Sequence, residues 1–160
     1  MSVLSLCMVM PLILPMSDFQ KRKVCEYEPI IKKWSRENNI KPELVASIIY
    51  FESGFHKNVV SSAGACGLMQ VIPKWTGKST RGKKYTCTDL KNPEVAIQAG
   101  TTAFRYILDK YTGKIDKALC FYNAGTICIK SKTYYKRSSY VRRVKKAYEN
   151  ILSYTQEIEP

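Results

Sequence analysis

The stretch PELVASIIYFESG, residues 42–54, decides the fold that we expect for this chain of 160 residues. Proline is favoured at the first position of a helix and glycine just after the last, so the stretch predicts one helix between Pro42 and Gly54. Apolar side chains at positions 45, 48 and 49 share one face of that helix. Position 52 continues the same face, and its residue is Glu52. The stretch therefore places a carboxylic acid at the carboxyl end of an apolar helix face.

The setting of Glu52 predicts a raised pKa for its carboxyl group. Removal from water disfavours the ionised form, and the negative end of the helix dipole disfavours it further. A carboxylic acid that is still protonated near neutral pH can donate a proton to a leaving oxygen. Periodicity alone leaves a second interpretation open, in which Glu52 turns outward at a frayed helix end.

The rest of the chain indicates more helices around a long irregular middle. Pro29 suits the first position of a helix that carries Ile30, Ile31 and Trp34. Asn92 is typical of an N-cap, and it precedes another apolar helical pattern. The remaining predicted segments are an irregular region over residues 55–92, a helix over residues 93–112, a short helix over residues 115–123 and a last helix over residues 139–154. No segment alternates like a strand, so the expected fold class is all-α, in one compact domain.

The chain is strongly basic, with 26 lysines and arginines against 13 acids and a net charge of +13. One domain of ~100–150 residues leaves no room for a two-domain cofactor enzyme. Eight basic residues fall within residues 130–146 and five within residues 74–84. Such a strip attracts polyanions, and we expect anionic polymers of the cell envelope to be its partners. A solvated helix face and a nucleic-acid surface are the alternatives, although no nucleic-acid fold signature accompanies the strip and no specific nucleic acid is expected.

Six cysteines and a single histidine make a structural zinc site a poor interpretation. No two cysteines stand in a CxxC pair, whereas zinc ligands normally come in closely spaced pairs. An even number of cysteines allows disulfides in an oxidising compartment, but six cysteines have fifteen pairings and spacing does not choose among them. Buried reduced thiols are the alternative.

The N-terminal residues 3–16 are almost wholly apolar. At ~14 residues the segment is short of the ~20 that span a bilayer, and prolines at positions 11 and 15 interrupt it. A signal-like segment, a weak membrane anchor and an ordered arm packed on a partner all remain open, so membrane association is left undecided. A basic cluster at residues 21–23 ends this part. We therefore divide the chain into an N-terminal segment, residues 1–23, and a main helical domain, residues 24–160.

Three motifs follow one another along that domain: ESGF at residues 52–55, SSAGACGLMQ at residues 61–70 and FYNAG at residues 121–125. In type, order and separation they resemble the motifs of the soluble lytic transglycosylase family. The resemblance implies a goose-type lysozyme-like helical fold. Phe121 stands where the family usually has alanine, and the basic, glycine-rich residues 74–85 also depart from its pattern.

The resemblance also implies roles for individual residues. Glu52 is expected to be the only catalytic residue, acting as acid and then as base, and Tyr140 to hydrogen-bond its carboxyl group. The residues expected to contact the saccharide are Ser61, Met69, Gln70, Tyr122, Asn123 and Tyr140.

Ordinary glycosidases use two carboxylates. The resemblance implies a family that works with one, and the three motifs contain one. Glu52 would protonate the oxygen of the β-1,4 bond between N-acetylmuramic acid (MurNAc) and N-acetylglucosamine (GlcNAc). It would then accept a proton from the C6 hydroxyl of the muramic sugar, which closes a 1,6-anhydro ring. No metal or cofactor is expected. The alternatives are a muramidase of the same fold that uses water, and a non-catalytic module that binds the wall or a virion.

The expected partners are peptidoglycan glycan strands and, beyond them, proteins of a phage particle or a secretion machine. The expected setting is the periplasm or cell wall, reached by a bacterial export pathway or in a phage virion. The small, strongly basic chain favours the phage.

Overall fold

The computed structural model describes residues 5–131 and 133–157, and within them the chain is helical. The helices are α1 (Leu6–Ile13), α2 (Asp18–Glu37), α3 (Pro42–Ser53), α4 (Pro93–Lys110), α5 (Ile115–Ala124), α6 (Ile127–Lys130), α7 (Tyr134–Arg137) and α8 (Ser139–Glu157), with 3-10 turns η1 (Pro73–Trp75) and η2 (Asp89–Lys91). Extended backbone pairs only in isolated bridges within these residues. The all-α prediction is confirmed, and no described helix combines the length and apolar character that a bilayer crossing needs.

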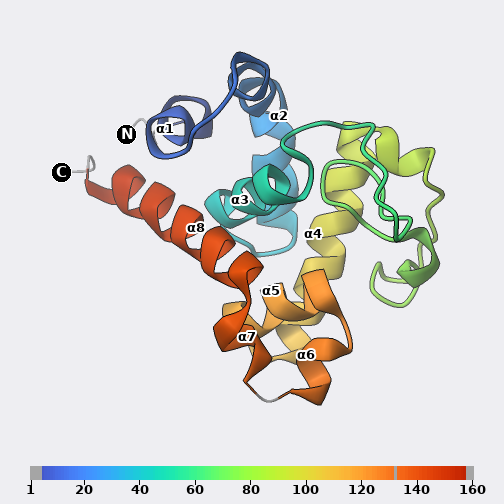
Figure 1. The fold of residues 1–160 in the computed structure, drawn as a ribbon. Helices are drawn as coiled ribbons and strands as arrows, with labels where there is room; N and C mark the ends of the chain where they lie inside the picture. Colours follow the sequence, from blue (N-terminus) through green and yellow to red (C-terminus); the bar gives the residue numbers. More distant parts are fainter. Residues whose placement is uncertain (1–4, 132, 158–160) are drawn as a thin grey trace.

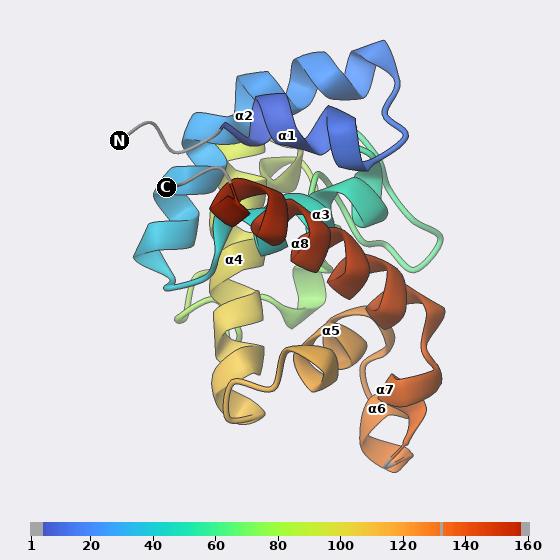
Figure 2. The ribbon, with the colours of Figure 1, turned by 90° about the vertical axis from the view of Figure 1, so that its left-hand side faces the viewer.

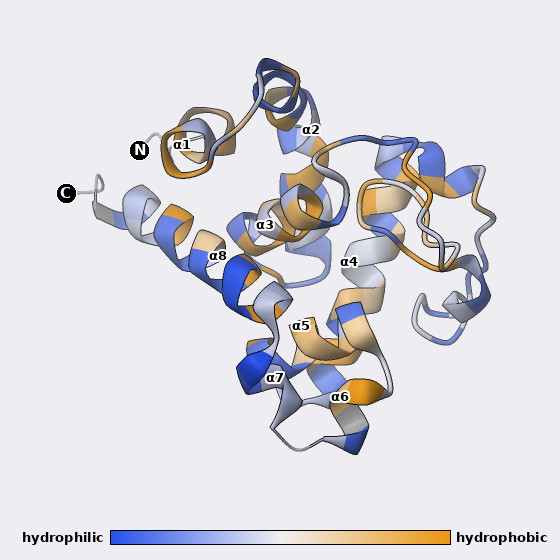
Figure 3. Ribbon diagram, in the orientation of Figure 1, coloured by the Kyte–Doolittle hydropathy of each residue, from blue (hydrophilic) through white to orange (hydrophobic). Residues whose placement is uncertain are grey.

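Helix α3 lies at the centre of the molecule, where α2 and α8 pack against it (Figure 1). It is apolar on more than one face, and most of its residues are buried. A helix with that pattern is stable only when other helices surround it. In the turned view α8 crosses in front of α3 while α1 runs beside α2 (Figure 2). Hydropathy follows the same plan, with apolar ribbon toward the centre and hydrophilic ribbon along α8 and α7 (Figure 3).

The predicted boundaries of α3 are confirmed, and those of α4 and α5 fall close to the predicted ones. Pro42 is the first residue of α3, and Gly54 ends the helix in a left-handed conformation with φ of 57°. The side chain of Asn92 caps α4 by accepting a hydrogen bond from the amide of Val95 at 3.3 Å. Helix α5 ends at Gly125, as the sequence predicts.

The predicted start of α2 at Pro29 is wrong. The helix begins at Asp18, and Ser17 and Gln20 form a capping box there. Pro29 lies inside the helix, and its side chain is exposed. A proline in the sequence can therefore resemble a helix start without being one. The spacing of Ser17 and Gln20 was the signal that identifies the true N-terminus.

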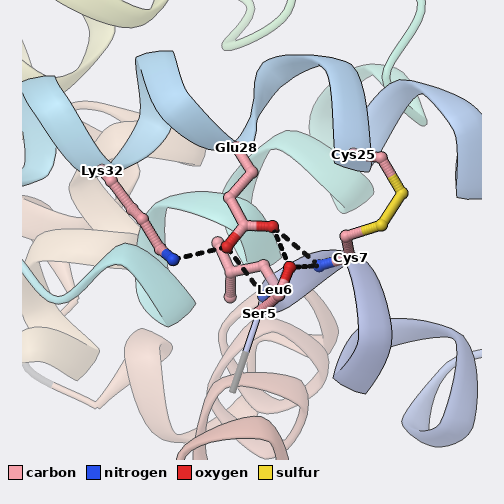
Figure 4. Close-up of polar contacts among 6 residues, drawn as sticks. All are labelled: Ser5, Leu6, Cys7, Cys25, Glu28 and Lys32. Atoms are coloured by element: carbon pink, nitrogen blue, oxygen red, sulfur yellow. Dashed lines mark hydrogen bonds and ion pairs between the residues drawn. A yellow bond between two sulfur atoms is a disulfide. The ribbon is translucent and has the colours of Figure 1, made fainter. Parts of the chain in front are cut away.

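Helix α1 is held against α2 by the buried carboxylate of Glu28 (Figure 4). This carboxylate accepts hydrogen bonds from the Ser5 hydroxyl and from the amides of Leu6 and Cys7, both at 3.1 Å. Lys32 pairs with the same carboxylate at 2.6 Å. The first amides of a helix lack partners within the helix, so Glu28 completes the hydrogen bonding of α1. This cluster, the Glu28 clasp, joins part of the N-terminal segment to the helical body.

Three disulfides join the six cysteines, which decides between the two interpretations left open above. The pairs are Cys7–Cys25, Cys66–Cys87 and Cys120–Cys128. The first fastens α1 to α2 beside the Glu28 clasp (Figure 4). The second connects Cys66 of the second motif to Cys87 near the end of the irregular middle, and the third closes a short loop from α5 to α6.

The irregular middle is packed closely against η2 and α4. Gly67 has φ of 75°, and a Cβ atom there would lie 1.8 Å from the carbonyl oxygen of Leu90. Only glycine fits such a contact. Gly100 of α4 also allows a close contact, because a Cβ atom there would lie 2.4 Å from the sulfur of Met69. These two glycines bring the GLMQ segment, residues 67–70, onto the helical body.

Candidate active site

Glu52 is the second-last residue of α3, and its side chain is partly buried. One turn earlier, Ile48 and Ile49 are fully buried, which fixes the direction of this helix face. The hydroxyl of Tyr140, near the start of α8, donates a hydrogen bond to Oε1 of Glu52 at 2.5 Å. The outward, frayed orientation that periodicity left open is therefore not the one observed, and the hydrogen bond expected from Tyr140 is present.

Burial raises the pKa of Glu52 from 4.5 to about 7, although the hydrogen bond from Tyr140 acts in the opposite direction. Burial also raises the pKa of Tyr122 and that of Tyr140 well above 10, and the nearby charge of Glu52 adds to both shifts. Both tyrosines therefore keep their protons near neutral pH. The site holds one carboxyl group that can gain or lose a proton and two hydroxyl groups that stay neutral.

Tyr122 links helix α5 to the GLMQ segment. Its hydroxyl donates a hydrogen bond to the backbone oxygen of Met69 at 2.7 Å. Its ring packs edge-on against Phe104 of α4, with 5.6 Å between ring centroids. These two contacts hold the phenol of Tyr122 beside the GLMQ segment.

Ser53, to which the sequence pattern assigns no role, makes the direct link between α3 and the same segment. Its buried hydroxyl donates to the backbone oxygen of Leu68 at 2.8 Å, in addition to a bond at 3.3 Å to Ile49 within the helix. The contact holds the chain beside Glu52 in place. Its position inside the ESGF motif was the available signal.

Ser61 and Gln70 stabilise the loop that carries the second motif. The hydroxyl oxygen of Ser61 accepts from the amide of Ala65 at 3.0 Å. The Gln70 amide donates to the backbone oxygens of Val59 at 3.1 Å and Gly67 at 2.9 Å. Their contact with a saccharide stays a prediction, and both keep some exposed surface.

Met69 differs from the expectation of a groove-lining side chain. The side chain is fully buried against Gly100 of α4 because that glycine leaves room for it. What Met69 brings to the site is its backbone oxygen, which Tyr122 holds. Asn123 lies exposed near the end of α5, and a role in substrate binding stays a prediction for it.

The site is defined by these hydrogen-bonded side chains. Two surface hollows, of about 210 and 390 Å³, are lined by residues around His56 and around Tyr135, and none of the predicted site residues lines either. In the described residues no three histidine, cysteine, aspartate or glutamate side chains come close enough to share a metal ion.

The family described as "Transglycosylase SLT domain" matches residues 29–144, most of the chain and all three motifs. The chain belongs to the transglycosylase SLT domain family. Helix α1 and the first part of α2, with Cys7, Cys25 and Glu28, lie outside the matched residues.

Curated relatives of this SLT domain chain occur in bacteria and in a phage. It is 31% identical over 112 residues to the membrane-bound lytic murein transglycosylase C of Actinobacillus pleuropneumoniae serotype 5b (strain L20). That match covers 62% of this chain and 31% of the relative. The chain is 34% identical over 92 residues to the transglycosylase of Enterobacteria phage PRD1, which covers 58% of this chain and 32% of the relative. The chain thus spans about a third of the length of these relatives.

A solved structure confirms the lysozyme-like helical fold expected for an SLT domain. The lytic transglycosylase Slt of Pseudomonas aeruginosa, solved as an inactive mutant with glutamate replaced by glutamine, is similar with a TM-score of 0.67. The match covers 88% of this chain and 26% of that one at 20% sequence identity. At that identity the similarity shows the fold.

Proposed function

We propose that this protein is a peptidoglycan lytic transglycosylase that cleaves the β-1,4 bond between MurNAc and GlcNAc. The observation that carries the proposal is the partly buried carboxyl group of Glu52, with a pKa of about 7 and a hydrogen bond from Tyr140. Such a group is half protonated near neutral pH and can act both as an acid and as a base. Membership of the SLT family and the names of its murein-cleaving and phage relatives support the same activity.

In the first step protonated Glu52 donates its proton to the glycosidic oxygen, and the bond to the muramic C1 breaks. Positive charge develops on that sugar, and the GlcNAc fragment leaves with the proton. Glu52 is now a carboxylate beside the cation, held in orientation by the hydroxyl of Tyr140. Preorganised groups of this kind stabilise charge where it develops.

In the second step the carboxylate removes the proton from the C6 hydroxyl of the same sugar. The C6 oxygen bonds to C1, which closes the 1,6-anhydro ring and returns Glu52 to its protonated form. An internal hydroxyl competes well with water when the site orients it. Burial and the hydrogen bond from Tyr140 are the causes that set the pKa of Glu52 among the described residues. A carboxyl group that acts alone fits the internal reaction, whereas ordinary glycosidases use a pair of carboxylates.

The proposed partner is the glycan strand of murein, and the proposed setting is the cell wall or periplasm, outside the reducing cytosol. Three disulfides support that setting, since disulfides persist in oxidising compartments. The relatives include a bacterial membrane-bound enzyme and a phage enzyme, and both are compatible with the proposed setting.

Mass spectrometry of digested murein separates this reaction from hydrolysis. Transglycosylation gives anhydro-muramic ends, which are ~18 Da lighter than the reducing ends that a muramidase leaves, because water is the deciding reagent. Reducing ends alone would assign the chain to the muramidase class.

Glu52→Gln tests the assigned residue. The amide cannot donate a proton to the bridging oxygen, so we expect cleavage to fall by at least ~10³-fold while murein binding survives. Glu43→Gln is the matched control, since Glu43 is a buried glutamate at the opposite end of α3 and should leave cleavage intact. Cleavage by the Glu52 variant at the rate of the parent would refute the assignment, and loss of binding as well as cleavage would indicate a misfolded site.

A further inference from the structure

A group of exposed cations gathers on α6, α7 and the first half of α8. We name this group the α6–α8 basic face, and its members are Lys130, Lys136, Arg137, Arg142, Arg143 and Lys146. Among the described residues none of these side chains forms an ion pair, whereas Lys145 on the same helix pairs with Asp116 at 3.0 Å. In Figure 3 the ribbon of α7 is strongly hydrophilic, and hydrophilic stretches alternate with apolar ones along α8. The face therefore carries positive charge that no ion pair within residues 5–131 and 133–157 neutralises.

The basic face begins at the edge of the candidate active site. Arg143 lies one turn after Tyr140 on α8, and Tyr140 donates its hydrogen bond to Glu52. The Arg143 guanidinium lies 5.4 Å from the centre of the Phe51 ring, the residue before Glu52. Arg142 and Lys146 are four residues apart and so share a side of α8. A polymer that reaches Glu52 would pass beside Arg143, and Arg142 and Lys146 continue the positive charge round the exposed side of the same helix.

We propose that the α6–α8 basic face binds the carboxylate-bearing peptide stems of the glycan strand that Glu52 cleaves. This inference rests on the proposed function, because it identifies which part of murein the face meets. The stems are attached to the muramic sugar, the same sugar whose glycosidic bond is broken. A stem carries free carboxylates on a flexible chain, and the cations are likewise exposed on flexible side chains.

The arrangement favours a repeated, weak, charge-dependent grip along the strand. Each exposed pair contributes little on its own and is screened by salt, so the effect depends on several stems meeting several cations. Such a grip lowers the Michaelis constant for polymeric murein but leaves the proton transfer at Glu52 unchanged. A strand without stems would lose the benefit while keeping the sugar bond that is cut.

The test compares two triple variants that each remove three positive charges. One is Arg142→Gln with Arg143→Gln and Lys146→Gln, from the basic face. The control is Arg36→Gln with Lys41→Gln and Lys91→Gln, which are exposed cations on α2, the start of α3 and η2. Binding to insoluble murein is measured by sedimentation in the Glu52→Gln background, so that no substrate is consumed. Turnover is measured in the otherwise unchanged chain.

We expect the basic-face variant to bind intact murein ~10-fold more weakly at low salt, with the difference vanishing toward ~0.5 M salt as screening increases. The control variant should bind like its parent. On strands whose stems have been removed with an amidase, the parent and the basic-face variant should bind equally. In turnover the Michaelis constant on intact murein should rise with an unchanged kcat.

Equal binding by the two triple variants would overturn the proposal, and so would undiminished binding of the parent to stem-free strands. A short DNA duplex serves as the competing polyanion. If it displaced the parent from murein at concentrations below those of free stem peptide, the face would be a phosphate-binding surface instead. Failure of the proposed function is a separate result, seen as an absence of cleavage by the unchanged chain on either substrate.

Discussion

At the residue scale, the hydrogen bond from Tyr140 to Glu52 joins two helices that are far apart in the sequence. Glu52 ends α3 and Tyr140 begins α8, and the bond between them lies at the packed contact of those helices. Burial raises the pKa of the carboxyl group and the bond lowers it, so the protonation of Glu52 reflects a balance between the two. Removal of either effect should therefore shift the pKa of Glu52 in a known direction.

Tyr140→Phe should raise the pKa of Glu52 further, because the carboxylate loses the donor that stabilises it. Protonated Glu52 starts the reaction, so the alkaline limb of kcat/KM should move upward by about one pH unit, the size expected for a hydrogen bond to a charged group. Tyr122→Phe is the control, since Tyr122 donates to the backbone oxygen of Met69 instead. A limb that stays in place in the Tyr140 variant would show that the bond does not tune Glu52.

Gly67→Ala should destabilise the fold by more than about 3 kcal/mol, because the added methyl group would collide with the backbone oxygen of Leu90. Gly64→Ala is a matched control. Gly64 has φ of 77° against 75° for Gly67, but its side-chain direction is open. The control should lose only about 1 kcal/mol, the cost of the left-handed backbone. Urea denaturation measures both, and equal losses would mean that the contact with Leu90 relaxes freely.

The substrate contacts are the part of the site that the sequence predicts least well at this scale. Glu52 follows from its helix face together with the ESGF motif, since periodicity alone leaves its orientation open, and its neighbour Tyr140 follows from the family resemblance. The buried position of Met69 could not be predicted, because it depends on Gly100, which lies thirty-one residues away on another helix. The saccharide contacts of Ser61, Gln70, Tyr122 and Asn123 stay predictions.

At the element scale, helix ends marked by proline, glycine and a polar cap were predictable from the sequence. The ends of α3 and the start of α4 carry these local signals, and local signals can be read without knowledge of the fold. The start of α2 was mistaken because Pro29 carries a start signal inside a longer helix. The pairing of the cysteines was not predictable, since it depends on which elements meet in space.

The disulfide Cys66–Cys87 holds the irregular middle in the form that supports the site. Its partners are 21 residues apart, and Cys66 also lies between the paired backbones of Val60 and Val71. This segment has little regular structure of its own, so its order depends on that crosslink, on Gly67 and on the hydrogen bonds of Gln70. The candidate active site therefore depends on a loop that is stabilised by a covalent bond.

Replacement of Cys66 and Cys87 together by serine should cost about 3 kcal/mol of unfolding free energy, the size expected for a loop of this length. The amides of residues 66, 67 and 71, which bond within the loop, should exchange with deuterium faster. The control replaces Cys120 and Cys128, which lie 8 residues apart and should leave those amides protected. If both variants lost protection at these amides, or if neither did, the Cys66–Cys87 disulfide would not be what orders the loop.

At the scale of the whole molecule, two carboxyl groups give stability opposite dependences on pH. The pKa of Glu52 is raised in the fold, so the unfolded chain releases this proton first as pH rises above 4.5. Stability from this group falls between pH 4.5 and about 7 and is level above that. For Glu28, burial opposes ionisation, but the bonds from Lys32, Ser5 and Cys7 prevail and lower its pKa. Its contribution is present above its unfolded pKa and is lost as pH falls.

Glu52→Gln should therefore stabilise the fold in a pH-dependent way. The variant and its parent should be about equally stable at pH 4, where the carboxyl group is protonated in both the folded and the unfolded chain. By pH 8 the variant should be more stable by up to about 3 kcal/mol, the free energy that corresponds to a change in pKa from 4.5 to about 7. Urea denaturation at several pH values measures the difference. Parallel curves for the two proteins would mean that the ionised side chain is well solvated in the fold.

The crosslink between Cys7 and Cys25 spans the turn that connects α1 to α2. Proteolytic cleavage of that turn would leave the N-terminal piece covalently attached, and the carboxylate of Glu28 would still hold the start of α1 in register. Shedding of the first helix consequently requires two independent chemical events, scission of a peptide bond and reduction of a sulfur–sulfur bond.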